Sequence, residues 1–213
     1  VRYKKYRYRR ASMKLITAYS DSFRSQLERF KNCITESHGF DLISVNLELK
    51  YVNTSFRESN KFGYYLFKPD IIRSYLDQMK DGEIFVYMDI NDLPLIGLKE
   101  YIIKKFNDSN VDIFTVATNY RNTKYCHLEY YKKLSLFDKF RSNINFQVEA
   151  GFIAIRKSES SKLFLNEWFE KTNSIRVLNE KYNSNTSRHD QEAFTYTMLN
   201  YNFVKAENWF LYK

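Results

Sequence analysis

The ten residues EIFVYMDIND, at positions 83–92, are the most informative part of this sequence. An almost uninterrupted apolar run of this length is typical of a strand that is buried on both faces, as in a parallel sheet. The run passes directly into three side chains that carry oxygen, Asp89, Asn91 and Asp92. Ligands bind in the crevice outside the carboxyl ends of parallel strands. The stretch therefore predicts a central strand over 83–88 whose end faces a ligand.

Strands and helices are expected to alternate on both sides of this stretch. Apolar runs and apolar–polar alternation predict strands at 13–19, 38–49, 112–118, 147–156 and 202–212. Helical spacing of apolar residues predicts helices at 22–32, 68–79, 98–106, 159–171 and 190–199. Residues 119–145 show no clear pattern, and the polar composition of 173–188 predicts a loop. The alternation indicates a single α/β domain with a mainly parallel sheet flanked by helices.

Length and composition are those of one globular domain. The chain has 213 residues, of which 44% are hydrophobic and 28% charged, so it can bury a core and is not a disordered segment. The apolar runs are far shorter than the roughly 20 residues that span a bilayer, and no signal-peptide pattern is found. Two cysteines are too few for a disulfide framework. We therefore expect a cytoplasmic protein without a transmembrane segment.

The formal net charge of +9 raises the question of a nucleic-acid partner. Residues 1–10 hold six basic residues and no acidic one, interleaved with three tyrosines, whereas the rest of the chain is nearly balanced. Such a segment could stack on single-stranded nucleic acid, lie on a membrane surface, stay solvated, or be a leader ahead of Met13. We expect residues 1–12 to be a basic arm or leader, residues 13–213 to form the domain, and nucleic acid not to be a partner.

Two short segments carry candidate metal ligands. Residues at i and i+2 of an extended chain lie on one side, so Asp89 and Asn91 can face one ion, and Asp92 can join them if the backbone turns. Oxygen ligands of this kind suit magnesium or manganese. His189 and Asp190, at the start of the last predicted helix, offer a nitrogen and a carboxylate. A turn after a strand explains residues 89–92 equally well, and Asp190 is also a natural N-cap.

Two further residues have a structural interpretation and a functional one. Gly151 lies inside the strand predicted at 147–156, where a glycine suggests close approach by a ligand or another backbone. Trp168 lies on the apolar side of the helix predicted at 159–171, which favours a place in the core.

Taken in order, these pieces resemble the nucleotide-sugar glycosyltransferases of the GT-A fold. The resemblance runs from Met13 onward and rests on LITAY at 15–19, GYYLFKP at 63–69, DGEIFVYMD at 81–89, EAGFIAIRK at 149–157, Trp168, and HDQ at 189–191. The second segment is similar to a Gly-Tyr-x-x-Trp-Lys-Pro signature, with Phe67 in place of the tryptophan. In the DxD motif, Asn91 stands where the second acid belongs, so either Asn91 or Asp92 takes that role.

The pattern also resembles the glycosyltransferase domains of large DNA viruses of algae, especially the first domain of a multidomain protein that glycosylates the capsid protein. That narrower resemblance implies an enzyme of the host cytoplasm that is a domain of a larger protein.

The resemblance implies a GT-A-like, Rossmann-like fold and a metal-dependent transfer reaction. A hexose or deoxyhexose would pass from a nucleoside-diphosphate sugar, most commonly a UDP-sugar, to a glycan or glycoprotein acceptor. Mn²⁺ or Mg²⁺ would stabilise the charge that develops on the departing diphosphate. The implied metal ligands are Asp89, Asn91 or Asp92, and His189.

The resemblance also implies roles for residues around the nucleotide and the sugar. Thr17, Ala18 and Tyr19 would border the nucleobase and ribose, Asp89 and Ile90 would contact the nucleotide, and Lys68 would neutralise diphosphate charge. Asp190 and Gln191 would bind sugar hydroxyls. Glu149 could act as a general base if the reaction inverts the anomeric centre, whereas retention needs no such base.

Two other classes of protein share part of this pattern. A sugar nucleotidyltransferase would have the same sheet and metal, but it normally needs a glycine-rich basic loop after the first strand. Residues 18–22 here read Ala-Tyr-Ser-Asp-Ser, without a glycine. A nucleic-acid-binding module would need basic residues grouped beyond Arg10, and the near balance of the remaining chain opposes it.

Overall fold

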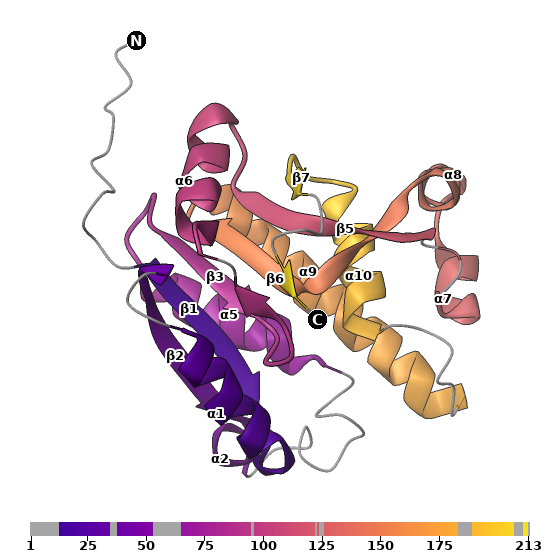
Figure 1. Cartoon of the computed structure of the whole chain (residues 1–213). Helices are drawn as coiled ribbons and strands as arrows, with labels where there is room; N and C mark the ends of the chain where they lie inside the picture. The colour runs from indigo at the N-terminus through magenta and orange to yellow at the C-terminus, as the bar shows by residue number, and fades with distance from the viewer. Residues whose placement is uncertain are drawn as a thin grey trace.

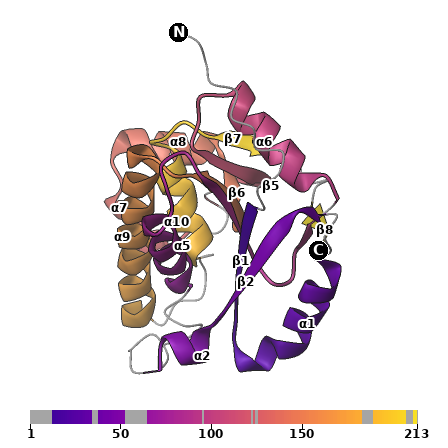
Figure 2. The same cartoon turned by 90° about the vertical axis from the view of Figure 1, so that its left-hand side faces the viewer.

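The computed structural model describes residues 13–34, 38–52, 65–94, 96–121, 123, 126–182, 189–206 and 211–212. These residues form three layers, a central sheet with helices on both of its faces (Figures 1 and 2). Among them, no helix has the length and apolar character needed to cross a bilayer.

Six strands make up the main sheet within the described part of the chain, in the order β2-β1-β3-β6-β5-β7. Their bounds are β1 Met13–Tyr19, β2 Phe40–Asn46, β3 Ile84–Met88, β5 Ile113–Arg121, β6 Phe146–Arg156 and β7 Val204–Ala206. The pairs β1–β2, β1–β3 and β5–β7 are parallel, whereas β6 runs antiparallel to both β3 and β5. The prediction of a mainly parallel, mixed sheet is confirmed. A second, two-stranded sheet joins β4 (Leu93–Pro94) to β8 (Leu211–Tyr212).

The apolar run that predicted a central strand is explained by two hydrophobic cores. All five residues of β3 are buried. Phe85 and Tyr87 contribute to one core, and Ile84, Val86 and Met88 to the other. Because successive side chains of a strand point to opposite faces, a strand between two cores must be apolar at every position.

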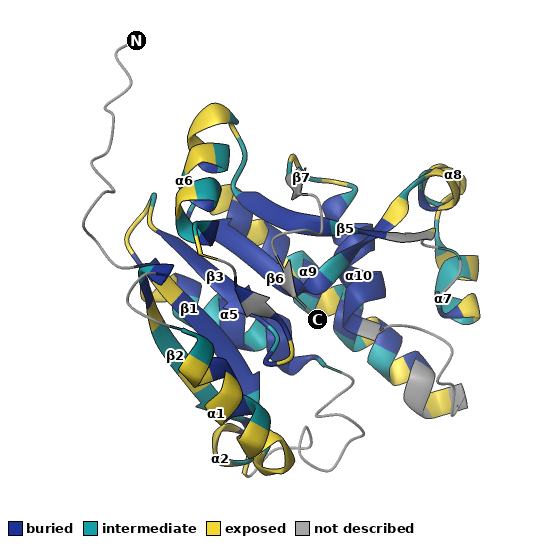
Figure 3. Ribbon diagram, in the orientation of Figure 1, coloured by how far each residue is buried: buried dark blue, intermediate teal, exposed yellow. Residues whose placement is uncertain are grey.

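Helices from distant parts of the chain cover the two faces of the sheet (Figure 2). One face carries α1 (Arg24–Cys33) and α6 (Leu98–Asp108), and the other carries α5 (Phe67–Asp77), α9 (Glu159–Tyr182) and α10 (His189–Met198). A short 3₁₀ helix, η1 (Asp21–Phe23), leads into α1. Figure 3 shows the sheet buried between these layers, with the exposed residues on the outer sides of the helices.

The predicted strand at 38–49 ends earlier in the structure. β2 stops at Asn46, whose side chain accepts a hydrogen bond from the backbone N–H of Leu49 at 3.1 Å. Asn46 thereby caps the short helix α2 (Leu47–Lys50), as asparagine commonly does. The alternation of Leu47 and Leu49 that suggested a longer strand belongs to this helix.

Three further elements differ from the prediction. The loop predicted over 173–188 is wrong for residues 173–182, because α9 continues to Tyr182 and buries Ile175 and Leu178. The segment 119–145 contains α7 (Leu128–Lys133) and α8 (Leu136–Ile144). α10 begins at His189, so Asp190 lies in its first turn and is not the N-cap.

Candidate active site

Lys68 lies at the centre of a group of charged side chains at the carboxyl end of β3. Its Nζ donates to Asp89 Oδ2 at 2.9 Å, lies 3.0 Å from Asp190 Oδ2, and is 3.4 Å from the backbone oxygen of Ala150. These three oxygens come from the segment after β3, from the first turn of α10 and from β6. The ammonium thus makes hydrogen bonds to Asp89 and Ala150 and an ion pair with Asp190. The site therefore joins segments that are far apart in the chain.

Only one of the three charged side chains reaches solvent. The side chains of Lys68 and Asp190 are 6% and 7% exposed, whereas that of Asp89 is 35% exposed. Burial raises the pKa of Asp190 to about 6; Lys68 opposes this rise and Asp89 adds to it. Burial would lower the pKa of Lys68, but Asp190 and Asp89 outweigh it and hold that pKa above its usual value. Lys68 is therefore a permanent cation that keeps a buried carboxylate in place.

Two tyrosines complete the surroundings of Lys68 and Asp89. The hydroxyl of Tyr87 donates to Asp89 Oδ1 at 3.0 Å, and burial, followed by the charge of Asp89, raises the pKa of Tyr87 well above its usual value. The Nζ of Lys68 lies 5.2 Å from the ring centre of Tyr65. Tyr65 has φ of 67°, in the left-handed region that is unfavourable for a large side chain. Neither tyrosine is a candidate site residue from sequence alone, although Tyr87 stands two positions before Asp89 and so faces the same side of the strand.

Asp89 and Asp92 direct oxygens toward one small space above Gly151. A methyl group on Gly151 would lie 3.0 Å from Asp89 Oδ2 and 3.0 Å from Asp92 Oδ2. A tight turn causes this convergence, because the backbone N–H of Asp92 donates to the carbonyl of Asp89 at 2.9 Å. The turn buries Asp92 and leaves Asn91 exposed. Of the two predicted partners of Asp89, the structure brings Asp92 to it and not Asn91.

A bulge in β6 shapes the floor of this space. Thr115 of β5 pairs with Ile153, but Ala117, two residues later, pairs with Val148, so β6 contains extra residues at 149–152. The hydroxyl of Thr115 lies 2.7 Å from the carbonyl oxygen of Glu149 and 2.9 Å from that of Phe152, which holds the bulge. Bulges are common beside active sites because they redirect a strand locally.

The other predicted site residues lie around this group. β1 runs parallel to β3, with Ile16 opposite Tyr87, so Thr17, Ala18 and Tyr19 end beside the turn that follows β3. Thr17 and Ala18 are buried and Tyr19 is half-buried. The side chain of Ile90 packs into the hydrophobic core on the α1 and α6 face.

α10 presents three predicted site residues at its start. Gln191 donates through Nε2 to Gln147 Oε1 at 3.1 Å, which ties α10 to β6. His189 is the first residue of α10; its side chain, like Gly63 and Tyr64, lies outside the described residues. Trp168 is fully buried, as predicted, and its Nε1 donates to the backbone oxygen of Asp190 at 3.0 Å. Trp168 therefore also holds Asp190 in position.

The donor set fits a divalent cation that prefers oxygen ligands. Two carboxylate oxygens converge where Gly151 leaves room, and Mg²⁺ is often held by only one or two carboxylates, with substrate phosphates filling other positions. Among the described residues there is no group of three or more His, Cys, Asp and Glu side chains arranged to hold a metal. Asp89 and Asp92 thus offer two carboxylate oxygens that suit such a cation.

Comparison with known proteins identifies the fold. No protein-family model and no curated protein matches the sequence. The structure is similar to the apo structure of WbbM, a bifunctional glycosyltransferase (TM-score 0.59, 12% identity, covering 92% of this chain and 39% of that chain). It is also similar to apo mouse xyloside xylosyltransferase 1 (TM-score 0.53, 10% identity, covering 92% and 85%). A third similar structure is a glycosyltransferase involved in the glycosylation of the major capsid of PBCV-1 (TM-score 0.51, 11% identity, covering 92% and 82%).

These similarities establish the fold class. The chain has the GT-A fold, and the resemblance to GT-A glycosyltransferases stated from the sequence is confirmed at that level. The chain spans 39% of the length of WbbM.

Proposed function

We propose that this chain is a glycosyltransferase that moves a sugar, a hexose or deoxyhexose, from a UDP-sugar to a hydroxyl group of a glycan or glycoprotein. The observation that carries this proposal is the convergence of Asp89 and Asp92 above Gly151, next to the buried pair Lys68–Asp190. The group lies outside the carboxyl end of β3, where ligands of open α/β sheets bind. The fold that the chain shares with glycosyltransferases supports the same assignment.

Asp89, Asp92 and His189 are the proposed ligands of Mn²⁺ or Mg²⁺. The exposure of Asn91 favours Asp92 as the second carboxylate. When bound, the metal would supply charge stabilisation for the diphosphate leaving group. Thr17, Ala18, Tyr19 and Ile90 are proposed to border the nucleoside.

The charged pair Lys68–Asp190 is proposed to organise the sugar end of the site. Asp190 and Gln191 bind hydroxyl groups of the donor sugar, and Lys68 holds the Asp190 carboxylate ionised and fixed. A carboxylate that need not reorganise during the reaction binds a hydroxyl more effectively than a mobile one. In an inverting reaction, Glu149 accepts the proton of the acceptor hydroxyl. A cytoplasmic location, a longer parent protein and the arm at residues 1–12 remain predictions.

Calorimetric titration of UDP tests the proposed function. We expect binding in the presence of Mn²⁺, and an affinity that falls at least about tenfold when a chelator removes the metal, a change of ~1.4 kcal/mol. Asp92→Asn should weaken the metal-dependent binding, whereas Asn91→Ala should leave it unchanged, because only the Asp92 carboxylate faces Asp89. Equal affinity with and without chelator would contradict the metal assignment. Failure of every nucleotide sugar to raise the melting temperature would contradict the function itself.

Gly151→Ala is expected to damage the metal site while leaving the fold intact. The new methyl group would lie 3.0 Å from one oxygen of Asp89 and 3.0 Å from one oxygen of Asp92. Both carboxylates must therefore move away from this methyl group by a few tenths of an ångström. They are the ends of side chains, and we therefore expect a nearly unchanged melting temperature. The Mn²⁺ concentration needed for half-maximal UDP binding should rise by about tenfold or more. Gly151→Val should have a larger effect, and identical metal dependence in all three proteins would refute the role of this space.

A further inference from the structure

Helix α8 packs against the molecule with a polar side and exposes its apolar side. At about 100° per residue, Leu136, Phe137, Phe140 and Ile144 fall within one arc of about 100°. These four side chains, the α8 face, are between 59% and 85% exposed. Ser142, on the opposite side, is fully buried. A surface helix normally has the reverse arrangement, with its apolar stripe toward the core.

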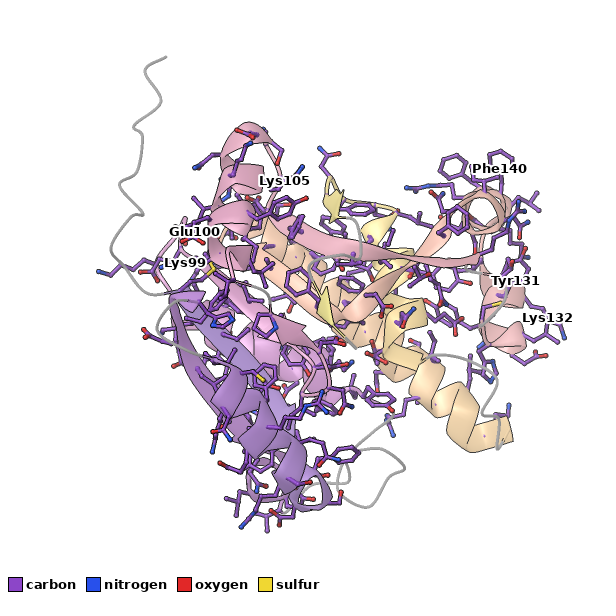
Figure 4. All side chains as sticks on the ribbon, in the orientation of Figure 1. Lys99, Glu100, Lys105, Tyr131, Lys132 and Phe140 are labelled. Atoms are coloured by element: carbon purple, nitrogen blue, oxygen red, sulfur yellow. The ribbon has the colours of Figure 1, made fainter. Side chains whose placement is uncertain are left out.

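Exposed apolar side chains are concentrated in this part of the molecule. Among the described residues, twelve large apolar side chains are exposed, and six of them lie between Leu128 and Phe146. Single exposed apolar residues need no explanation, whereas a group of them marks an interaction surface. Figure 3 shows the exposed residues of α8, and Figure 4 shows Phe140 pointing away from the body of the protein.

Basic side chains border the α8 face on both sides. At helical spacing, Lys139 follows one border of the apolar arc and Arg141 the other. The guanidinium of Arg141 lies 5.3 Å from the ring centre of Phe137. The Nζ of Lys139 donates to the backbone oxygen of Lys132 at 2.9 Å, which brings it beside the last turn of α7, where Lys132 and Lys133 are exposed.

Acidic residues offset only part of this basic border. Between residues 128 and 146 there are four basic and two acidic side chains. Glu129 is paired with Lys132 at 2.7 Å, and Asp138 accepts the hydroxyl of Ser135 at 2.8 Å. Outside residues 1–10 the chain carries a formal charge of only +3, so the excess of two basic residues at 128–146 is a large part of it. An opposing surface with negative charge is therefore favoured.

The α8 face is preformed and held on the body of the protein. The Glu192 carboxylate of α10 accepts the backbone N–H of His127, just before α7, at 3.0 and 2.9 Å. Ser135 caps α8 by accepting the N–H of Asp138 at 3.1 Å, and Arg141 donates to Asn200 Oδ1 at 3.1 Å. Binding through the α8 face therefore needs no folding step.

We propose that the α8 face docks the protein on a lipid bilayer that contains anionic headgroups. Phenylalanine, leucine and isoleucine side chains enter the boundary between headgroups and acyl chains, and the basic border contacts the phosphates, as in interfacial amphipathic helices. An apolar centre bordered by cations on both sides, with basic residues in excess of acidic ones, matches this surface better than a neutral protein partner. One strand connects α8 with the candidate site, because β6 begins at Phe146 after α8 and reaches Gly151 five residues later, at most about 17 Å along the chain.

Vesicle sedimentation with the full chain tests this proposal. We expect the wild-type protein to sediment with vesicles of phosphatidylcholine mixed with phosphatidylglycerol, less so as salt increases. The double variant Phe137→Ser/Phe140→Ser should lose at least about tenfold in partition coefficient. Leu163→Ser is the matched control, because Leu163 is 61% exposed on α9, outside the α8 face. It should bind like wild type. All substituted side chains are exposed, so the melting temperatures should agree.

A tryptophan placed in the α8 face separates insertion from charge attraction. Vesicles with brominated acyl chains should quench the added fluorescence of Phe140→Trp but not that of Leu163→Trp. Binding without quenching at position 140, or undiminished binding of the double variant, would overturn the proposal in favour of attraction through the basic residues at 1–10. Absence of vesicle binding would also overturn it. Self-association of the wild-type protein that the double variant abolishes would overturn it too, because the α8 face would then join two copies of the chain.

Discussion

Replacing Lys68 by methionine is expected to lower the free energy of unfolding by about 3–5 kcal/mol, the usual effect of removing one partner from a buried ion pair. Methionine has a similar volume, so the loss comes from charge. Asp190 is buried and would keep a carboxylate with no cation beside it, while Asp89 would lose its 2.9 Å contact. Denaturant unfolding monitored by circular dichroism measures the change.

Two further variants separate this effect from a general loss of packing. Lys68→Met/Asp190→Asn should recover much of the lost stability, because neither charge of the buried pair remains. Lys162→Met removes a cation from an exposed pair with Glu159 and should leave the melting temperature unchanged. If Lys68→Met unfolds at the denaturant concentration of wild type, the Lys68 pair does not stabilise the fold.

Asp190→Asn is expected to reduce sugar transfer by about tenfold or more, equivalent to at least ~1.4 kcal/mol of barrier, and to lower stability less than Lys68→Met does, because Lys68 keeps Asp89 as a partner. The amide keeps the shape of the carboxylate but loses the charge that strengthens its hydrogen bonds to hydroxyl groups. Burial raises the pKa of Asp190 to about 6, so ionising this carboxyl costs more in the folded protein than in the unfolded chain, although the carboxylate is still the main form at neutral pH. An uncharged amide removes this cost, which offsets part of the lost interaction with Lys68, so the melting temperature should fall less than in Lys68→Met. Turnover of the active donor and the melting curve are measured on one preparation.

The matched control for this variant is Asp112→Asn. Asp112 directly precedes β5 and pairs at 3.0 Å with Arg156, the last residue of β6. This pair lies at the ends of the strands opposite to the candidate site. Its replacement should leave turnover unchanged. Near wild-type turnover in Asp190→Asn would reduce Asp190 to a structural partner of Lys68.

Local sequence patterns predict the strands of the sheet and the strand ends at which the site lies. The continuous apolar run of β3 predicts a strand between two cores, and the residues that follow it predict the position of the acidic group. The choice between Asn91 and Asp92 depends on a backbone turn, which spacing alone does not specify. The contacts of Lys68 could not be predicted, because Asp89 and Asp190 follow it by 21 and 122 positions and only the assembled sheet brings them together.

The errors in the helices have physical causes too. α9 extends beyond its predicted end because Ile175 and Leu178 are buried against the rest of the protein, although the sequence around them is polar. Residues 119–145 show no clear pattern because α8 exposes its apolar side. Apolar residues at helical spacing normally indicate a helix whose apolar side faces the core, but those of α8 face solvent.

The position of β6 between β3 and β5 has a consequence for protein synthesis. β6 leaves the ribosome after both of its neighbours, since Phe146 follows Met88 by 58 positions. At roughly 5–20 residues per second, one edge of β3 waits about 3–12 s for its partner. During that time an entirely apolar strand presents unpaired N–H and C=O groups, which other nascent chains can bind. A ribosome that stalls before residue 146 therefore holds a chain in which one edge of β3 is open to pairing with strands of other chains.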